Sequence, residues 1–386
     1  MKFTVNAKKL KIMMEKSLAA IDKKSYSEIM RLYFNVEKDC LKVLGTNLEH
    51  WLEVTSDEVY NVESGAFGID IDDIKILSKM NGEITLEDVP TENKLNIKFG
   101  RKIVSIPCHE NNQTLPIMDK TETKIMAAKE NWLLETITNL SIYTSNDKIK
   151  PLTQVFHFNI KQKKIEALDG HCIGMRSIEN QTIYEKAKSI KLHNRCIPVF
   201  KKAMDKKSEN ELTIYSDEKF LKVQNTDFTY ITKNIEGDFF KVDSMLNIAE
   251  RFCFTPCRKE FYDIMSYNNE LTKNEEIPRP VILHSENGRL YSYLRTLKYE
   301  TFDEIDTIEN SMKDDFYYGF NPKYLMDAFN IVDSDYPKCV GYSSKAPLII
   351  KGNEYKFLIL PISFGSETKN AKFKQVFSGY INKQSA

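Results

Sequence analysis

The chain has 386 residues, and its hydrophobic fraction of 41% is enough to form several buried cores. Its 55 basic and 55 acidic residues give a formal net charge of zero, which excludes a protein that holds nucleic acid by bulk charge alone. No apolar run approaches the roughly 18 residues of a membrane span, and the N-terminus lacks the apolar core of a secretory signal. We therefore expect a cytoplasmic protein with no membrane partner.

A unit of roughly 60 residues recurs six times along the chain. Each unit is predicted to contain a short strand, a helix of about three turns and then alternating strands. The six helices are expected at KKLKIMMEKSLAAI from Lys8, DIDDIKILSKM from Asp70, KENWLLETITNL from Lys129, LHNRCIPVFKKAM from Leu192, CRKEFYDIMSYN from Cys257 and NPKYLMDAFNIV from Asn321. Six similar modules indicate an architecture set by repetition and, taken in pairs, predict three domains.

Each module also carries a run in which apolar and polar residues alternate, the pattern of a strand with one buried face. These runs begin at Cys40, Leu95, Phe156, Lys219, Arg289 and Pro347, and short polar breaks such as GTN at Gly45, FGRK at Phe99 and KGNE at Lys351 predict turns. The predicted fold class is α+β, with two helices in each domain packed on antiparallel sheets.

The seven cysteines are an odd number without paired spacing, so we expect reduced and mostly buried thiols. Cys253 and Cys257 are close in sequence, but no second pair accompanies them, and the nearest histidine, His284, is isolated. The sequence predicts neither a metal site nor a cofactor.

Lysine is concentrated on several of the predicted helices, although the whole chain is neutral. For a single helix, a solvated face is an equally good interpretation. Recurrence in several modules favours a shared basic surface, formed by residues that include Lys8, Lys9, Lys16, Lys23, Lys24, Lys75, Lys79, Arg195, Lys201 and Lys202.

The sequence contains no phosphate-binding loop, dinucleotide fingerprint, zinc-protease motif or nucleophile elbow. The best candidate for chemistry is Asp169-Gly170-His171, where a carboxylate and an imidazole suggest a general-base pair. Asp-Gly is also a common turn former, and this interpretation is stronger. We expect a protein that is not an enzyme.

Six segments lie in an order and spacing that resemble the bacterial DNA polymerase III beta subunit, the sliding clamp. They are MKFTV from Met1, GTNLE from Gly45, ALDGH from Ala167, IEGDFF from Ile235, GFNPKYLMDAF from Gly319 and LPISF from Leu360. The resemblance covers Met1 to about Phe364, and it implies three clamp domains, at 1–121, 122–246 and 247–364. It further implies a head-to-tail homodimer that closes a ring around double-stranded DNA, independent of base sequence, with the basic helices facing the phosphates.

Clamps of this family bind short peptide motifs of the polymerase catalytic subunit, the clamp loader and other partners in a pocket between the second and third domains. The positions that match this pocket are Leu152, Leu168, Gly170, His171, Ile173, Phe240, Met245, Asn321, Tyr324, Leu358, Leu360, Pro361 and Ile362. For Leu358 and Leu360, spacing alone favours ordinary strand core. The family often has threonine in place of Leu168 and proline in place of Phe240, so the peptide preference is expected to differ.

The resemblance places the dimer contact at Ser266 and Tyr267 of one subunit against Ile103 and Ile106 of the other. Serine weakens such a contact, which leaves open a clamp-like protein that does not close into a ring and acts as a protein-binding module. A hydrolase that uses Asp169 and His171 is a further alternative. Residues 365–386 extend beyond the usual family end and are expected to be mobile, although Phe373, Phe377 and Tyr380 permit docking.

Overall fold

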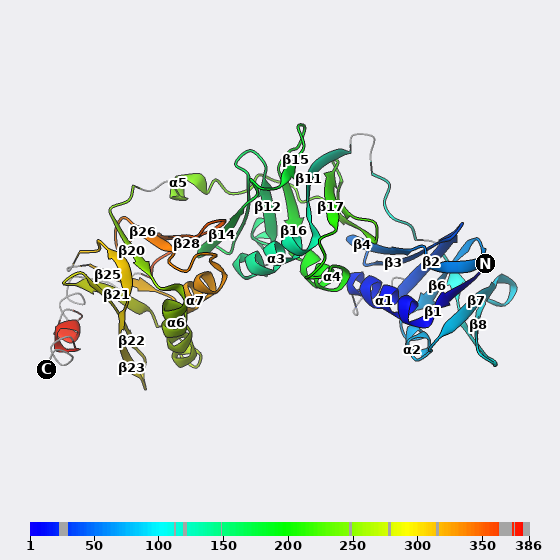
Figure 1. The fold of residues 1–386 in the computed structure, drawn as a ribbon, viewed down its shortest axis with the longest axis horizontal. Coiled ribbons are helices and arrows are strands. Elements are labelled where there is room, and N and C mark those ends of the chain that lie inside the picture. Colours follow the sequence, from blue (N-terminus) through cyan, green and yellow to red (C-terminus); the bar gives the residue numbers. More distant parts are fainter. Residues whose placement is uncertain are drawn as a thin grey trace. The chain divides into compact units, whose positions relative to one another are not determined.

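The computed structural model describes residues 1–22, 30–111, 113–118, 122–147, 149–246, 249–276, 279–313, 316–362, 373 and 375–380. The chain divides into two compact units, each assembled from several segments. The first unit comprises Met1–Thr138, Phe156–Lys163 and Glu179–Glu236, and the second comprises Asn139–Val155, Lys164–Ile178 and Gly237–Ala386. Antiparallel sheets with few helices confirm the predicted α+β class (Figure 1).

The first unit contains a five-stranded antiparallel sheet in the order β5-β1-β7-β8-β9. Its strands are β1 (Lys2–Asn6), β5 (Val59–Glu63), β7 (Glu83–Val89), β8 (Lys94–Phe99) and β9 (Lys102–Pro107). The break FGRK forms a tight hairpin, in which Phe99 pairs with Lys102 and Gly100 has a φ of 56°. Strand β9 lies at the edge of this sheet.

The first unit also contains a ten-stranded sheet in the order β10-β6-β2-β3-β4-β19-β18-β17-β11-β15. Its strands are β2 (Arg31–Glu37), β3 (Cys40–Thr46), β4 (His50–Ser56), β6 (Gly65–Asp70), β10 (His109–Glu110), β11 (Thr123–Lys129), β15 (Thr182–Ile183), β17 (Glu211–Ser216), β18 (Phe220–Gln224) and β19 (Phe228–Lys233). Two further strands, β12 (Val155–Asn159) and β16 (Ile190–His193), pair with each other. Leu52 of β4 pairs with Tyr230 of β19, so strands of the first two predicted domains share one sheet.

In the second unit, seven strands of one sheet lie in the order β13-β14-β28-β27-β26-β20-β24, and a separate sheet has four strands in the order β23-β22-β21-β25. The seven are β13 (Lys164–Leu168), β14 (Cys172–Ser177), β20 (Phe252–Pro256), β24 (Thr307–Asn310), β26 (Lys338–Gly341), β27 (Leu348–Lys351) and β28 (Tyr355–Ile359). The four are β21 (Val281–Glu286), β22 (Arg289–Arg295), β23 (Glu300–Ile305) and β25 (Tyr317–Phe320). Because β14 pairs with β28, the predicted second and third domains also share a sheet, and the three-domain division stays a prediction.

The helices of the first and last modules begin in the same way. The side chain of Asn6 accepts a hydrogen bond from the Lys8 amide at 2.9 Å and begins α1 (Ala7–Ser17). Asn321 accepts from the Lys323 amide at 3.0 Å and begins α7 (Pro322–Ile331). In both helices an asparagine N-cap satisfies an amide that the first turn leaves free.

The helices α3 (Glu130–Leu140) and α6 (Arg258–Thr272) also form where they were predicted. In the second unit, α6 and α7 pack side by side (Figure 1), and their Phe261 and Phe329 rings stack with centroids 4.1 Å apart. The short α5 (Asp243–Leu246) was not predicted. Single 3-10 turns lie at Leu18–Ala20, Pro90–Glu92, Ser141–Tyr143 and Pro151–Thr153.

Two predicted helices are shorter than expected. The helix predicted from Asp70 is α2 (Ile74–Leu77), a single turn, because Asp70 still belongs to β6 and accepts a hydrogen bond from Arg31 at 2.7 Å. The helix predicted from Leu192 begins only at Cys196, as α4 (Cys196–Ala203), because Leu192 completes strand β16. In both places, residues predicted to begin a helix belong to a paired strand instead.

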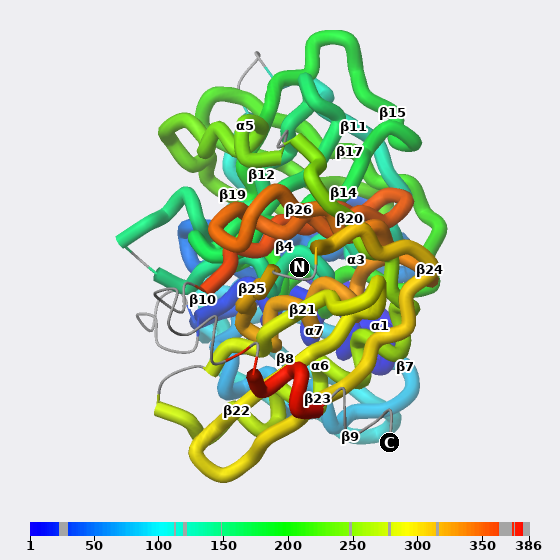
Figure 2. The backbone as a smooth tube through the Cα atoms, turned by 90° about the vertical axis from the view of Figure 1, so that its left-hand side faces the viewer, coloured from blue at the N-terminus to red at the C-terminus, as the bar shows by residue number. Residues whose placement is uncertain are grey.

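The described part of the C-terminal extension, Phe373 with residues 375–380, is helical, and we call it the tail helix. Phe377 is fully buried, and Phe373, Val376 and Tyr380 pack around it on the four-stranded sheet. Figure 2 shows the red tail helix against β22 and β23. For these residues the packing favours the docking alternative over a mobile extension, because their apolar side chains recur on one helical face and bury one another on the sheet.

Candidate functional site

A cavity of about 380 Å³ opens in the second unit beside the β13–β14 hairpin. Eight of the residues predicted for a peptide pocket line it: Leu168, Gly170, His171, Ile173, Phe240, Met245, Leu358 and Leu360. Its lining is mostly apolar, with a few polar groups at the rim, as is usual for a site that binds a small ligand or a peptide segment. The cavity therefore brings together residues from three distant parts of the sequence.

The floor of the cavity is a cluster of buried apolar side chains. Leu168 of β13, Ile173 of β14 and Leu358 of β28 pack with Met175, Val242 and Leu246, and Leu360 packs against this cluster. Ile173 pairs with Leu358 across the sheet, and beyond β28 the Leu360 amide donates to the His171 carbonyl at 2.9 Å. The end of β28 is thus fixed to the turn between β13 and β14.

That turn is Asp169-Gly170-His171, the candidate for acid–base chemistry. The Asp169 carboxylate accepts hydrogen bonds from the amides of His171 at 2.8 Å and Cys172 at 2.9 Å, and Gly170 has a φ of 97°. These bonds identify an Asx turn, in which glycine occupies the left-handed position. The Asp169 carboxylate stabilises the backbone of this turn, which supports the interpretation of the motif as a turn.

The hydrolase alternative needs a nucleophile beside Asp169 and His171. The nearest thiol is that of Cys172, whose sulfur lies 3.3 Å from Asp169 Oδ1. Burial, and then the Asp169 carboxylate, raise the pKa of this thiol far above its usual range. A thiol that stays protonated is a poor nucleophile, so this geometry does not favour hydrolysis.

The rim of the cavity combines aromatic, aliphatic and cationic groups. Phe240 and Met245 are 45% and 39% exposed, unusual for large apolar side chains, and Lys150 and Lys241 also line the opening. His171 stacks on Tyr324 of α7, with centroids 6.2 Å apart and an interplanar angle of 19°. Burial raises the pKa of Tyr324 to about 12, so its hydroxyl is protonated at neutral pH.

Five predicted pocket residues do not line this cavity: Leu152, Asn321, Tyr324, Pro361 and Ile362. Tyr324 supports the rim through His171, and Asn321 begins α7. The Ile362 amide donates to the Gly319 carbonyl at 2.8 Å, which directs Pro361 and Ile362 along β25. A side chain at Gly237 would contact Leu152, which places Leu152 beside the segment that leads to Phe240.

Six lining residues were not predicted for a peptide pocket: Lys150, Thr153, Asp169, Cys172, Lys241 and Val242. Val242 and Leu246 recur at helical spacing, a signal that could have indicated α5. An ion-pair network fixes α5, since Lys164 Nζ lies 2.9 Å from carboxylate oxygens of both Glu166 and Asp243. Because Glu166 is buried, this network positions α5 more firmly than an exposed pair would.

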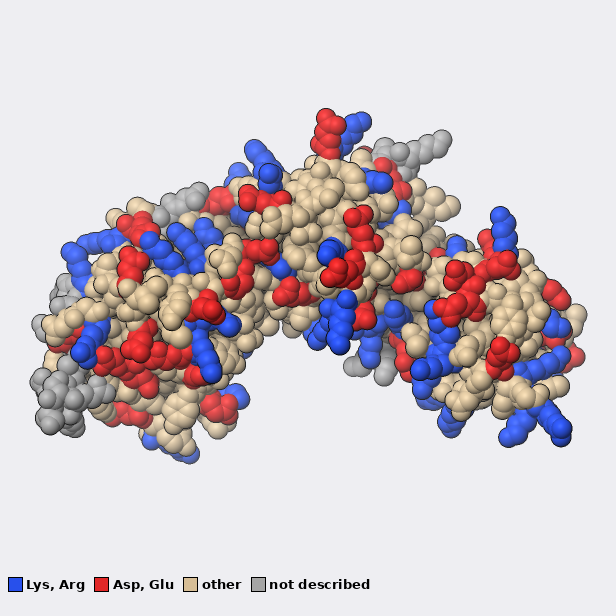
Figure 3. All heavy atoms as spheres, viewed as in Figure 1, with Lys and Arg blue, Asp and Glu red and all other residues tan. Residues whose placement is uncertain are grey.

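The basic residues predicted to face DNA lie on α1, α4 and the α2 turn of the first unit, where Figure 3 shows lysine and arginine gathered over α1 and α4. Lys9, Lys75 and Arg195 form ion pairs with Glu58, Asp72 and Glu49, respectively. Among the described residues, no ion-pair partner is found for Lys8, Lys16, Lys79, Lys201 and Lys202. Lys23 and Lys24 lie outside the described residues.

The residues predicted for the dimer contact differ in exposure. Ile103 on the edge strand β9 is 62% exposed and Tyr267 on α6 is 61% exposed, whereas Ser266 is half-buried. Ile106 is only 3% exposed, which corrects its predicted role: alternation along β9 turns its side chain into the core of its own unit. Of the four predicted residues, Ile103 and Tyr267 are the ones with exposed large side chains.

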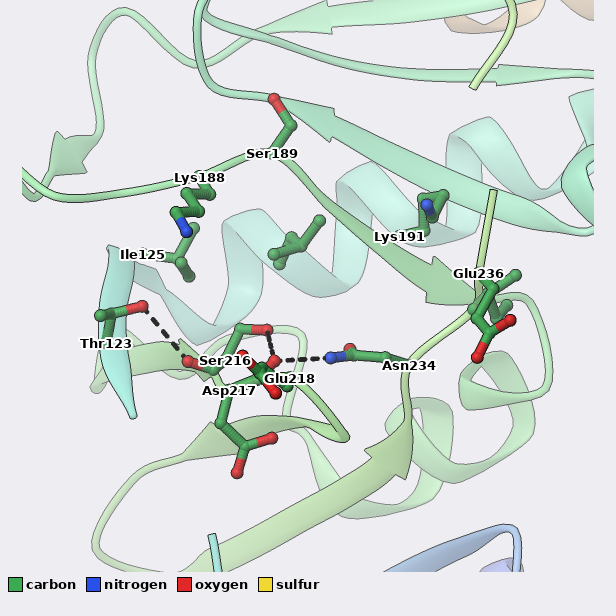
Figure 4. Close-up of a pocket in the computed structure, with 12 residues that line it drawn as sticks. Thr123, Ile125, Lys188, Ser189, Lys191, Ser216, Asp217, Glu218, Asn234 and Glu236 are labelled. Atoms are coloured by element: carbon green, nitrogen blue, oxygen red, sulfur yellow. Dashed lines mark hydrogen bonds between the residues drawn. The ribbon is translucent and has the colours of Figure 1, made fainter. Parts of the chain in front are cut away.

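A second cavity, of about 460 Å³, lies in the first unit and is lined by both lysines and carboxylates (Figure 4). Three of its polar side chains bond to the local backbone. Thr123 Oγ1 donates to the Ser216 carbonyl at 3.2 Å, and Asn234 Nδ2 donates to the Asp217 carbonyl at 2.7 Å. The Asp217 carboxylate accepts from the amides of Lys219 and Phe220. These contacts identify Thr123, Asp217 and Asn234 as residues that stabilise the local backbone.

Five of the seven cysteines are buried, which agrees with the prediction of mostly buried thiols, and all seven are free in this structure. Within the described ranges, no group of three His, Cys, Asp or Glu side chains has the geometry of a metal site. None of the helices in the part of the chain that the structure describes is long and apolar enough to cross a membrane.

No family model matches the sequence, and no match was found among curated proteins. Solved structures match over nearly the whole chain. The DNA polymerase sliding clamp of Bacillus subtilis is 14% identical with a TM-score of 0.85, and 95% of this chain covers 100% of that one. The DNA polymerase III subunit beta of Pseudomonas aeruginosa is 17% identical with a TM-score of 0.83, over 94% and 100% of the two chains. The beta chain of Streptococcus pneumoniae is 16% identical with a TM-score of 0.83, over 94% and 99%. The chain therefore has the fold of the DNA polymerase III beta subunit, the bacterial sliding clamp.

Proposed function

We propose that the protein is a DNA sliding clamp, which encircles duplex DNA as a head-to-tail homodimer and tethers a polymerase and other clamp-binding proteins for processive synthesis. The observation that carries this proposal is the match of nearly the whole chain to sliding clamps, each covered over 99% or more of its own length. A clamp acts by enclosing DNA, so its function follows from its architecture more directly than that of an enzyme does. We propose no catalytic role and no cofactor.

The basic helices support a sliding contact with DNA. On α1 and α4, the side chains of Lys8, Lys201 and Lys202 are solvent-exposed, and the two helices contact each other. Exposed ammonium groups attract phosphates without reading bases and bind more weakly as salt rises. Retention then depends on ring closure, which is compatible with a net charge of zero.

Two sheet edges support the head-to-tail contact. Strand β9 ends the five-stranded sheet and carries Lys102 beside the exposed Ile103, whereas β23 ends the four-stranded sheet and carries Glu300 and Glu304. An edge strand presents unpaired amides and carbonyls to a second strand. Opposite charges on the two edges favour β9 of one subunit against β23 of the other over the pairing of like edges.

The cavity beside the β13–β14 hairpin supports a role in partner binding. We propose that it receives the apolar anchors of a linear peptide from the polymerase, the clamp loader or another clamp-binding protein. Leu152, Asn321, Tyr324, Pro361 and Ile362 would then extend the same peptide path beyond the cavity. Lys150 and Lys241 at the rim favour peptides that carry an acidic residue beside those anchors.

Sedimentation equilibrium at micromolar concentration tests the ring. The chain mass is 44.9 kDa, and the proposal predicts a species of twice that mass. A purely monomeric protein would contradict the ring and favour the alternative of a clamp-like protein-binding module, while leaving the fold unaffected.

A further inference from the structure

The four-stranded sheet of the second unit has two buried faces. On one face, Thr301 Oγ1 of β23 donates to Asn268 Oδ1 of α6 at 2.7 Å. On the opposite face, register places Ile282, His284, Tyr291, Tyr293, Phe302 and Tyr317 together. Without a cover, this second face would expose a contiguous apolar and aromatic surface, which soluble proteins rarely leave uncovered.

The tail helix is the cover of that face. Phe373, Val376, Phe377 and Tyr380 recur at the spacing of one helical stripe, whereas Gln375 and Gly379 are exposed. The Phe377 ring lies 4.7 Å from His284, 5.5 Å from Phe302 and 5.7 Å from Tyr293, between ring centroids. Phe377 therefore fills the centre of the aromatic face.

The contacts of the tail helix reach the edge strand itself. Tyr380 stacks on Phe302 of β23, with centroids 4.8 Å apart and an interplanar angle of 11°. Glu300 of β23 accepts a hydrogen bond from the Tyr293 hydroxyl at 2.5 Å. An edge strand has a neighbouring strand on one side only, so packing on its two faces contributes much of its order.

We propose that the tail helix is a structural part of the subunit contact: by packing on the outer face of β23 opposite α6, it holds this edge strand in the position that receives β9 of a second copy. This proposal rests on the proposed ring. It adds a role for the tail helix, which lies beyond Phe364, where the resemblance to clamps ends. Loss of the tail helix would free β23 on one face and weaken the dimer without changing any residue of the two pairing strands.

The test compares four full-length chains: the wild type, Phe377→Ala, Tyr380→Ala and the control Gln375→Ala, whose side chain is exposed on the same helix. Dimer dissociation constants come from sedimentation velocity over a dilution series, and amide hydrogen exchange reports the order of β22 and β23. We expect both aromatic variants to raise the dissociation constant about tenfold or more, in the range of measured couplings between contacting residues, and to speed exchange in β23. The control should match the wild type.

The result that overturns the inference is a wild-type dissociation constant in both aromatic variants while exchange shows the tail helix released. Tyr380→Ala removes one surface contact and so remains informative if Phe377→Ala does not fold. A wild type that is monomeric at every concentration contradicts the ring itself, and with it the coupling. Because that outcome is measured on the wild type alone, it can be told apart from the result that overturns only the role of the tail helix.

Discussion

The backbone amide of Leu360 donates to the carbonyl oxygen of His171 at 2.9 Å and fixes the end of β28 to the β13–β14 turn. The two residues are far apart in sequence, and both line the candidate peptide cavity. Because this hydrogen bond joins main-chain atoms, a substitution at residue 360 changes the lining without removing the bond. The position is therefore suited to a test of the peptide site.

Leu360→Asp is expected to abolish most peptide binding. An aspartate there places an unpaired charge against the apolar cluster of Leu168, Ile173 and Leu358. For a clamp-motif peptide that binds with micromolar affinity, about 8 kcal/mol, we expect a loss of about a hundredfold. Fluorescence polarisation measures this, with the volume-conserving Leu360→Met as control. Equal affinity of the wild type and Leu360→Asp would place the partner site elsewhere.

Gly45→Ala is expected to destabilise the first unit by about 1–3 kcal/mol, the usual cost of overpacking. A Cβ at this position would lie 2.0 Å from the Ser17 carbonyl oxygen, a backbone atom at the end of α1. Gly379→Ala is the control, since nothing lies within 4 Å of its added Cβ. Thermal unfolding measures both variants. A melting temperature of Gly45→Ala equal to that of the wild type would show that α1 shifts away from β3 at little cost.

The stability of the first unit is expected to fall with pH below neutrality because of His50. Burial, and to a smaller extent His193, lower the pKa of His50 to about 4, whereas Asp22 opposes the shift. The unfolded chain therefore takes up the proton first, so the stabilisation is complete above the unfolded pKa of 6.5 and is lost as pH falls towards 4. As pH falls from 7.5 to 5, this histidine alone lowers the free energy of unfolding by about 2 kcal/mol.

Urea unfolding of the wild type and His50→Gln at these two pH values isolates that contribution. The variant should be less stable at neutral pH, because the buried glutamine amide needs hydrogen-bond partners that the site of the imidazole does not supply in full. Its stability should also depend less on pH. The same pH dependence in both proteins would show that other groups control acid sensitivity.

The paired substitution of Lys8 and Lys201 by alanine is expected to weaken the attraction for DNA and its dependence on salt. Both side chains are exposed, on α1 and α4. Two lost phosphate contacts lower the slope of log K against log salt by about 2. Alanine at Lys161 and Lys345, which are also exposed, controls for net charge. An unchanged slope for Lys8 and Lys201 would indicate that α1 and α4 do not face DNA.

Local signals in the sequence predicted the helix beginning at Asn321 and the hairpins at Gly100 and Lys351, because capping and turn chemistry act between close neighbours. The start of α2 was missed because Asp70 pairs with Arg31, thirty-nine positions away, and overrides the local pattern. Such long-range pairing is not visible in a single window of sequence.

The residues that were predicted for the candidate site came from the resemblance to clamps, not from local sequence patterns. Spacing alone indicated Leu358 and Leu360 as strand core, and both do pack on the core cluster while they line the cavity. Lys150 and Lys241 carry no local signal, since lysines of this kind are common on loops. The tail helix showed its apolar spacing in Phe373, Phe377 and Tyr380, but the aromatic face that it covers forms only when β21, β22, β23 and β25 pair.

Retention on DNA tests the central claim most directly. Protein loaded onto nicked circular duplex DNA should remain bound through a challenge with high salt and should be released when the circle is cut once, because a closed ring leaves only over an end. Release at the same rate from circular and linear DNA would contradict encirclement and indicate ordinary electrostatic binding.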